Sequence, residues 1–84
     1  MEENDVILII YDIPVKYTHP NGYGVQPSRP RSVIGRFVKA GWVDRIQESV
    51  LSVNDPRAIG PIFDAVAESG GKCMVVYGRI VREV

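Results

Sequence analysis

The chain has 84 residues, of which 45% are hydrophobic and 24% are charged, a composition typical of one folded domain and unlike that of a disordered segment. Ten basic and ten acidic residues cancel, so nucleic acid or an anionic membrane would have to meet a local patch. The single cysteine, Cys73, excludes an intrachain disulfide, and no apolar run reaches the roughly 18 residues of a membrane span. The acidic start lacks the basic segment of a signal peptide, so we expect a cytoplasmic protein with a single domain over residues 1–84.

Residues 5–14, DVILIIYDIP, are the clearest predicted element. Aliphatic residues at successive positions give both faces of this segment an apolar character, which predicts a central strand buried on both sides. Pro14 has no amide hydrogen to donate to a strand ladder and therefore ends the strand. Residues 15–31 then contain three prolines and two glycines without periodicity, which predicts a long loop.

A first helix is predicted up to about Ala40, with Ser28 or Ser32 as its cap and Gly41 as its stop. Residues 42–53 have strand-type residues around a polar centre, which predicts either one bent strand or a tight hairpin near Glu48.

A second helix is predicted after Asn54 or Asp55, one of which would cap it, with its regular part beginning near Gly60. Residues 72–81, KCMVVYGRIV, are the last predicted strand, with a bulge or bend at Gly78. The order of elements predicts an α+β fold, the ferredoxin-like βαββαβ sandwich, in which an antiparallel sheet carries two helices on one face.

Three segments carry a resemblance to a known family: YDIP at 11–14, an arginine-containing first helix, and GWVDRIQESV at 41–50. In these segments the chain resembles the small CRISPR-associated nuclease of the spacer-adaptation stage, an endoribonuclease family whose members are dimeric partners of the CRISPR integrase. The resemblance implies a homodimer that binds RNA or DNA in antiviral defence. It also implies metal-dependent endonuclease activity, the hydrolysis of phosphodiester bonds.

Asp12 is the residue to which the resemblance assigns catalysis and metal binding. In the family, this aspartate lies near the two-fold axis of the dimer, so two copies would flank one Mg²⁺ ion. Such an ion polarises a phosphodiester and acidifies a bound water. From the residues alone, an acid at a strand end followed by proline is more often a turn-forming or solvated residue than a catalytic one.

Arg29, Arg31 and Arg36 are the candidate phosphate-binding residues, because they gather at the start of the first predicted helix, where free amide groups also favour an anion. The alternative is an ordinary solvated helix face. Arg45 lies next to Asp44 and is expected to pair with a carboxylate, a structural role that we favour over contact with nucleic acid.

The sequence assigns no definite function to the remaining polar and aromatic residues. His19 lacks a sequence partner that would orient it as a general base, and the two loop tyrosines either stack on bases or anchor the loop to its own domain. Cys73 and Trp42 are expected to be structural, and the roles of four residues stay open: Tyr17, Tyr23, Gln47 and Ser49.

Two further functions fit the same fold. One is a non-catalytic interaction or architectural module that binds a protein partner, which the zero net charge and the long loop suit. The other is a toxin-like endoribonuclease. In the dimeric interpretation, the segment after Gly78 would add a strand to the partner subunit.

Overall fold

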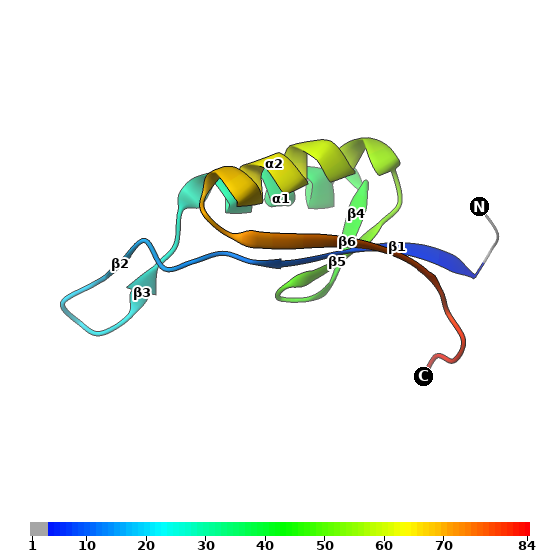
Figure 1. The fold of residues 1–84 in the computed structure, drawn as a ribbon, viewed down its shortest axis with the longest axis horizontal. Coiled ribbons are helices and arrows are strands. Elements are labelled where there is room, and N and C mark those ends of the chain that lie inside the picture. Colours follow the sequence, from blue (N-terminus) through cyan, green and yellow to red (C-terminus); the bar gives the residue numbers. More distant parts are fainter. Residues whose placement is uncertain (1–3) are drawn as a thin grey trace.

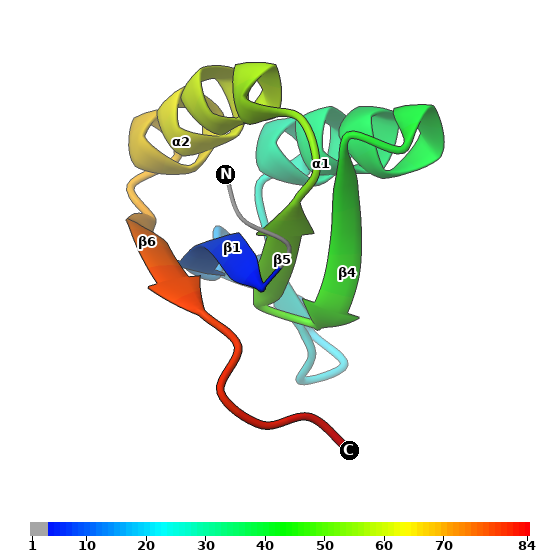
Figure 2. The same ribbon diagram turned by 90° about the vertical axis from the view of Figure 1, so that its right-hand side faces the viewer.

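The computed structural model describes residues 4–84. A four-stranded sheet lies under two helices, α1 (Ser28–Ala40) and α2 (Ile59–Glu68), as Figures 1 and 2 show. The strand order is β4-β5-β1-β6, and every neighbouring pair is antiparallel. The four strands are β1 (Asp5–Asp12), β4 (Val43–Gln47), β5 (Val50–Val53) and β6 (Lys72–Arg79). This is the predicted ferredoxin-like arrangement.

The core lies between the helices and one face of the sheet. Ile9 of β1 is fully buried and Tyr11 is 7% exposed, because alternate residues of the central strand face the helices. Leu8 and Ile10 point to the opposite face, where Ile10 is 40% exposed. The prediction that β1 is buried on both sides is therefore wrong for the single chain: no helix covers the second face in Figure 2.

Helix α1 buries Pro30, Val33 and Ile34 at helical spacing. It ends at Gly41 as predicted, because this residue adopts φ 78°, a left-handed conformation that a glycine reaches without steric cost. Its start differs from the prediction. Pro27 occupies the cap position and no side chain caps the helix, so neither predicted serine serves as a cap.

Residues 42–53 form the hairpin, with the register irregular between Arg45 and Gln47. Trp42 packs over the end of α1: its ring stacks on Phe37 with centroids 5.2 Å apart, and the Arg57 guanidinium lies 4.3 Å from its centre. The structural role expected for the tryptophan is confirmed.

Asp55 caps the short 3-10 turn Pro56–Ala58 that leads into α2. The last strand ends at Arg79, two residues earlier than predicted, and its pairing with β1 runs through Gly78 without interruption. The predicted bulge at Gly78 is therefore wrong. Residues 80–84 leave the sheet as an exposed tail (Figure 1).

The segment between β1 and α1 is more ordered than the predicted loop. Two short strands, β2 (Tyr17–Thr18) and β3 (Gly24–Val25), pair in a separate two-stranded ribbon, and α1 already begins at Ser28. We call residues 15–26 the arm. Figure 1 shows that the arm projects beyond the end of the sheet, so the molecule measures 48 Å along its longest axis but 26 Å and 21 Å across.

Candidate nucleic-acid interface

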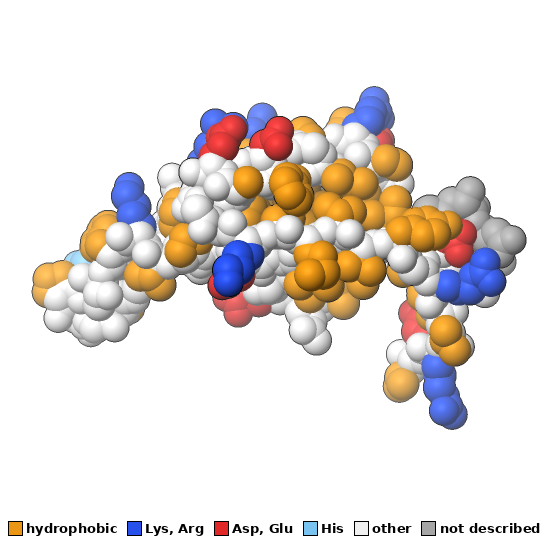
Figure 3. Space-filling model, viewed as in Figure 1, with side chains coloured by type: hydrophobic (Ala, Val, Ile, Leu, Met, Phe, Trp, Pro, Cys, Tyr) orange, Lys and Arg blue, Asp and Glu red, His pale blue; other side chains and the backbone are white. Residues whose placement is uncertain are grey.

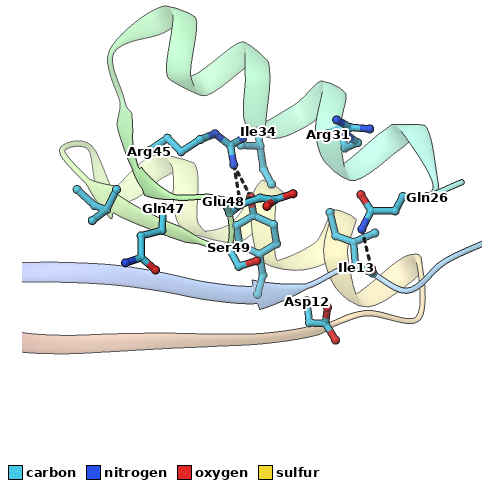
Figure 4. Close-up of a pocket in the computed structure, with 11 residues that line it drawn as sticks. Asp12, Ile13, Gln26, Arg31, Ile34, Arg45, Gln47, Glu48 and Ser49 are labelled. Atoms are coloured by element: carbon cyan, nitrogen blue, oxygen red, sulfur yellow. Dashed lines mark hydrogen bonds between the residues drawn. The ribbon is translucent and has the colours of Figure 1, made fainter. Parts of the chain in front are cut away.

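An open pocket of about 590 Å³ lies at the end of the sheet from which the arm departs. Its wall combines the end of β1, the first turns of α1 and the β4–β5 turn, as Figure 4 shows. Antiparallel pairing brings these segments together: β5 returns beside β1, so its preceding turn reaches the end of β1. The lining residues are Tyr11, Asp12, Ile13, Gln26, Arg31, Ile34, Arg45, Ile46, Gln47, Glu48 and Ser49.

Asp12 is an exposed residue at the last position of β1. In Figure 4 its carboxylate points away from α1, toward the uncovered face of the sheet. Lys72 of β6 stands opposite Asp12 in the antiparallel register, where a lysine and an aspartate attract one another. Asp12 also borders a smaller, mainly apolar hollow, together with Ile10 and Met74.

One chain offers few side chains that could bind a divalent cation near Asp12. Within residues 4–84, no three His, Cys, Asp or Glu side chains gather as a metal site. Mg²⁺ prefers several oxygen ligands in octahedral geometry, whereas Asp12 supplies one carboxylate and faces a lysine. A single chain therefore does not fit the implied ion, and a second copy of Asp12 would be needed.

The three candidate arginines do not converge. Arg31 lies in the pocket wall and forms no ion pair within the described part of the chain. Arg29 instead pairs with Glu68 of α2 at 3.5 Å, and both side chains are more than 60% exposed. Arg36 follows Arg29 by two helical turns, on the same flank of α1. Only Arg31 thus shares a pocket with Asp12.

Arg45 links two walls of the pocket, the β4–β5 turn and the end of β1, through hydrogen bonds. Its Nη1 donates to the Tyr11 hydroxyl at 2.9 Å and to the Glu48 carbonyl at 2.7 Å, and the same carbonyl accepts from the Tyr11 hydroxyl at 2.7 Å (Figure 4). The β4–β5 turn is thereby tied to the central strand. The neighbouring Asp44 accepts from Asn54, and Arg45 forms no ion pair with a carboxylate in the described part of the chain. The expected pairing is therefore not met, but the structural role expected of Arg45 agrees with its bonds to Tyr11 and Glu48.

Charge is segregated along the chain, a signal that the zero net charge conceals. Residues 13–43 contain five of the ten basic residues and no acidic residue, whereas the rest of the chain contains all ten acidic residues. The basic stretch folds into the arm and α1. The arm and α1 therefore carry basic side chains and no acidic ones, although Glu68 of α2 pairs with Arg29, and Asp12 and Glu48 share the pocket with Arg31.

Sequence reasoning missed Tyr11 and Gln26 as parts of the site. Tyr11 reads as a core residue, and its hydroxyl finds Arg45 and Glu48 only through the tertiary fold. Gln26 donates from Nε2 to the carbonyl of Ile13 at 3.0 Å and so fixes the base of the arm beside Asp12. Burial raises the pKa of the Cys73 thiol, in keeping with its structural role.

Comparisons with protein-family models, curated proteins and solved structures found no match to this chain. None of the helices described over residues 4–84 is long and apolar enough to cross a membrane.

Proposed function

We propose that the protein is a cytoplasmic, homodimeric nucleic-acid-binding protein of the CRISPR-adaptation type, with the CRISPR integrase as a candidate partner. The observation that carries this proposal is the acid-free stretch of residues 13–43. No carboxylate within this stretch competes with a nucleic-acid phosphate for its basic side chains, and the one ion pair that it forms within residues 4–84 is the exposed pair between Arg29 and Glu68 of α2. Arg31 and Arg36 are the residues we expect to contact phosphates, with Arg29 joining them when it leaves Glu68.

The uncovered face of the sheet supports the dimer. Apolar residues that pair across β5, β1 and β6 lie at the centre of this face. An exposed apolar patch of this kind marks an interaction surface, and a two-fold axis would let the same patch meet itself. The face contains Leu8, Ile10, Val50, Met74 and Val76. The tail after Gly78 would extend the contact to the partner's sheet edge.

Asp12 borders this face, so a face-to-face dimer would bring two copies of it toward the axis. Two carboxylates supply the ligands that one chain lacks, and Mg²⁺ held there would polarise a phosphodiester and lower the pKa of a water. Lys72 would lie beside a bound phosphate as a cation. The proposed activity is a metal-dependent endonuclease on RNA or DNA.

The decisive experiment compares wild type with Asp12→Asn, a substitution of nearly equal size. Both proteins are incubated with labelled single-stranded RNA and duplex DNA over a Mg²⁺ series, and binding is measured over a salt series. We expect Mg²⁺-dependent cleavage that the variant loses by at least tenfold, with binding and dimer mass unchanged. Affinity should fall steeply with salt, because phosphate contacts release counterions.

Other outcomes separate the alternatives. Binding by both proteins with cleavage by neither would make Asp12 a strand cap and the protein an architectural subunit. Neither binding nor cleavage would contradict the proposal and favour the module that binds a protein partner, whose surface would be the same apolar sheet face. A monomeric mass at micromolar concentration would exclude a metal site shared across a two-fold axis.

A further inference from the structure

The arm carries exposed aromatic rings that serve no core. Tyr17 and Tyr23 are both 54% exposed, and the arm ribbon pairs only with itself. Of the two roles left open for these tyrosines, anchoring the loop to its own domain does not agree with their exposure. Tyr23 instead stacks on His19, with ring centroids 4.4 Å apart and planes inclined by 9°.

The arm is built to hold this stack in place. The amide of His19 donates to the carbonyl of Tyr23 at 2.8 Å, and the amide of Gly22 donates to the carbonyl of His19 at 2.8 Å. Gly22 has φ 91°, a conformation that favours glycine and closes the turn. At the base of the arm, the amide of Lys16 donates to the carbonyl of Val25 at 2.5 Å. Two nearly parallel rings are therefore fixed at the projecting end of the protein.

The basic residues near these rings indicate which kind of ligand the rings would bind. The arm belongs to the acid-free stretch, and its base adjoins Arg31 and the pocket. In Figure 3 the projecting arm shows hydrophobic, basic and histidine side chains and no acidic ones. Proteins bind unpaired nucleotides with aromatic rings, on which the bases stack, and with nearby basic side chains, which contact the phosphates. A paired duplex hides its base faces and would use the cations alone.

We propose that the arm binds unpaired nucleotides, with a base stacked on the Tyr23–His19 pair and a second base on Tyr17, while Lys16 and Arg31 meet the phosphates. This inference rests on the proposed nucleic-acid binding and deepens it by naming the form of the ligand. The protein would prefer a nucleic acid with a single-stranded end over a fully paired one.

The test uses three fluorescent probes: a blunt DNA duplex, the same duplex with a single-stranded DNA tail, and one with an RNA tail. Wild type is compared with Tyr23→Leu, which removes the ring, and with Tyr23→Phe, which retains it. Tyr77→Leu controls for the loss of an exposed tyrosine ring outside the basic stretch, because Tyr77 is 64% exposed and lies in β6; its hydroxyl donates to Asp5 at 2.6 Å, so the variant also loses this bond and its fold is checked with the others. Circular dichroism and dimer mass are measured for every variant.

We expect tighter binding to a tailed probe than to the blunt duplex, and a loss of about 5- to 100-fold in tailed-probe affinity for Tyr23→Leu alone. Either tail chemistry supports the inference. Equal affinity of wild type for blunt and tailed probes would overturn it while leaving nucleic-acid binding intact. If no probe binds, the proposed function itself fails. A Tyr23→Leu variant that loses its dimer but not its tail preference would show that the arm contacts protein.

Discussion

Gly71 lies tightly packed between the end of α2 and the end of β1, the strand that carries Asp12. Replacing Gly71 by alanine tests how tight this packing is. A Cβ at Gly71 would lie 2.5 Å from the backbone oxygen of Asp12 and 2.8 Å from Cγ1 of Val66. Ordinary contacts begin at 3.4 Å, so the first is too short by about 0.9 Å and involves backbone, which cannot rotate away. Overpacking of this kind costs about 1–3 kcal/mol, whereas the entropy lost from the unfolded chain on removing a glycine returns only about 0.4–1 kcal/mol.

Gly35→Ala is the matched control, because nothing lies within 4 Å of a Cβ at Gly35, in the middle of α1. Alanine there should stabilise the helix by about 0.5–1 kcal/mol. At the centre of these ranges the two variants differ by about 2 kcal/mol in unfolding free energy. In urea unfolding, with a slope of about 1–2 kcal/mol per molar, the midpoint of Gly71→Ala should therefore fall below that of Gly35→Ala by about 1–2 M. Equal midpoints would refute the tight packing of Gly71 against Asp12.

Two further predictions concern local hydrogen bonds. Arg45→Met removes two donated bonds from the β4–β5 turn, so the urea midpoint should fall by the equivalent of about 1–2 kcal/mol, and an unchanged midpoint would contradict the tie to Tyr11 and Glu48. Hydrogen bonds from the side chain and then the backbone amide of Arg57 lower the pKa of Asp55 below its ordinary 3.8. Because the folded state favours the charged carboxylate, this stabilisation is present above about pH 4 and is lost as the pH falls through the lower folded pKa. The difference in thermal midpoint between wild type and Asp55→Asn should therefore shrink from pH 5 to below pH 3; a constant difference would argue against this carboxylate as its source.

The sequence by itself determined the order of elements. The apolar run in residues 5–12, the strand end at Pro14 and the helix stop at Gly41 are local patterns, so they are readable without knowing what each segment packs against. The ferredoxin-like order follows, because few topologies connect those elements without crossing. The Asp12 position at a strand end was likewise readable.

Only the tertiary structure decided how the site residues lie relative to one another. Arg29 and Arg31 are two residues apart, yet one pairs with Glu68 of the neighbouring helix and the other enters the pocket, because the helix turns them to different flanks. The partners of Arg45 are 34 and three residues away in sequence, and no local rule selects them. Which face of the sheet stays open, and that the loop becomes a projecting arm, depend on where two helices come to lie, a choice set by packing between segments distant along the chain.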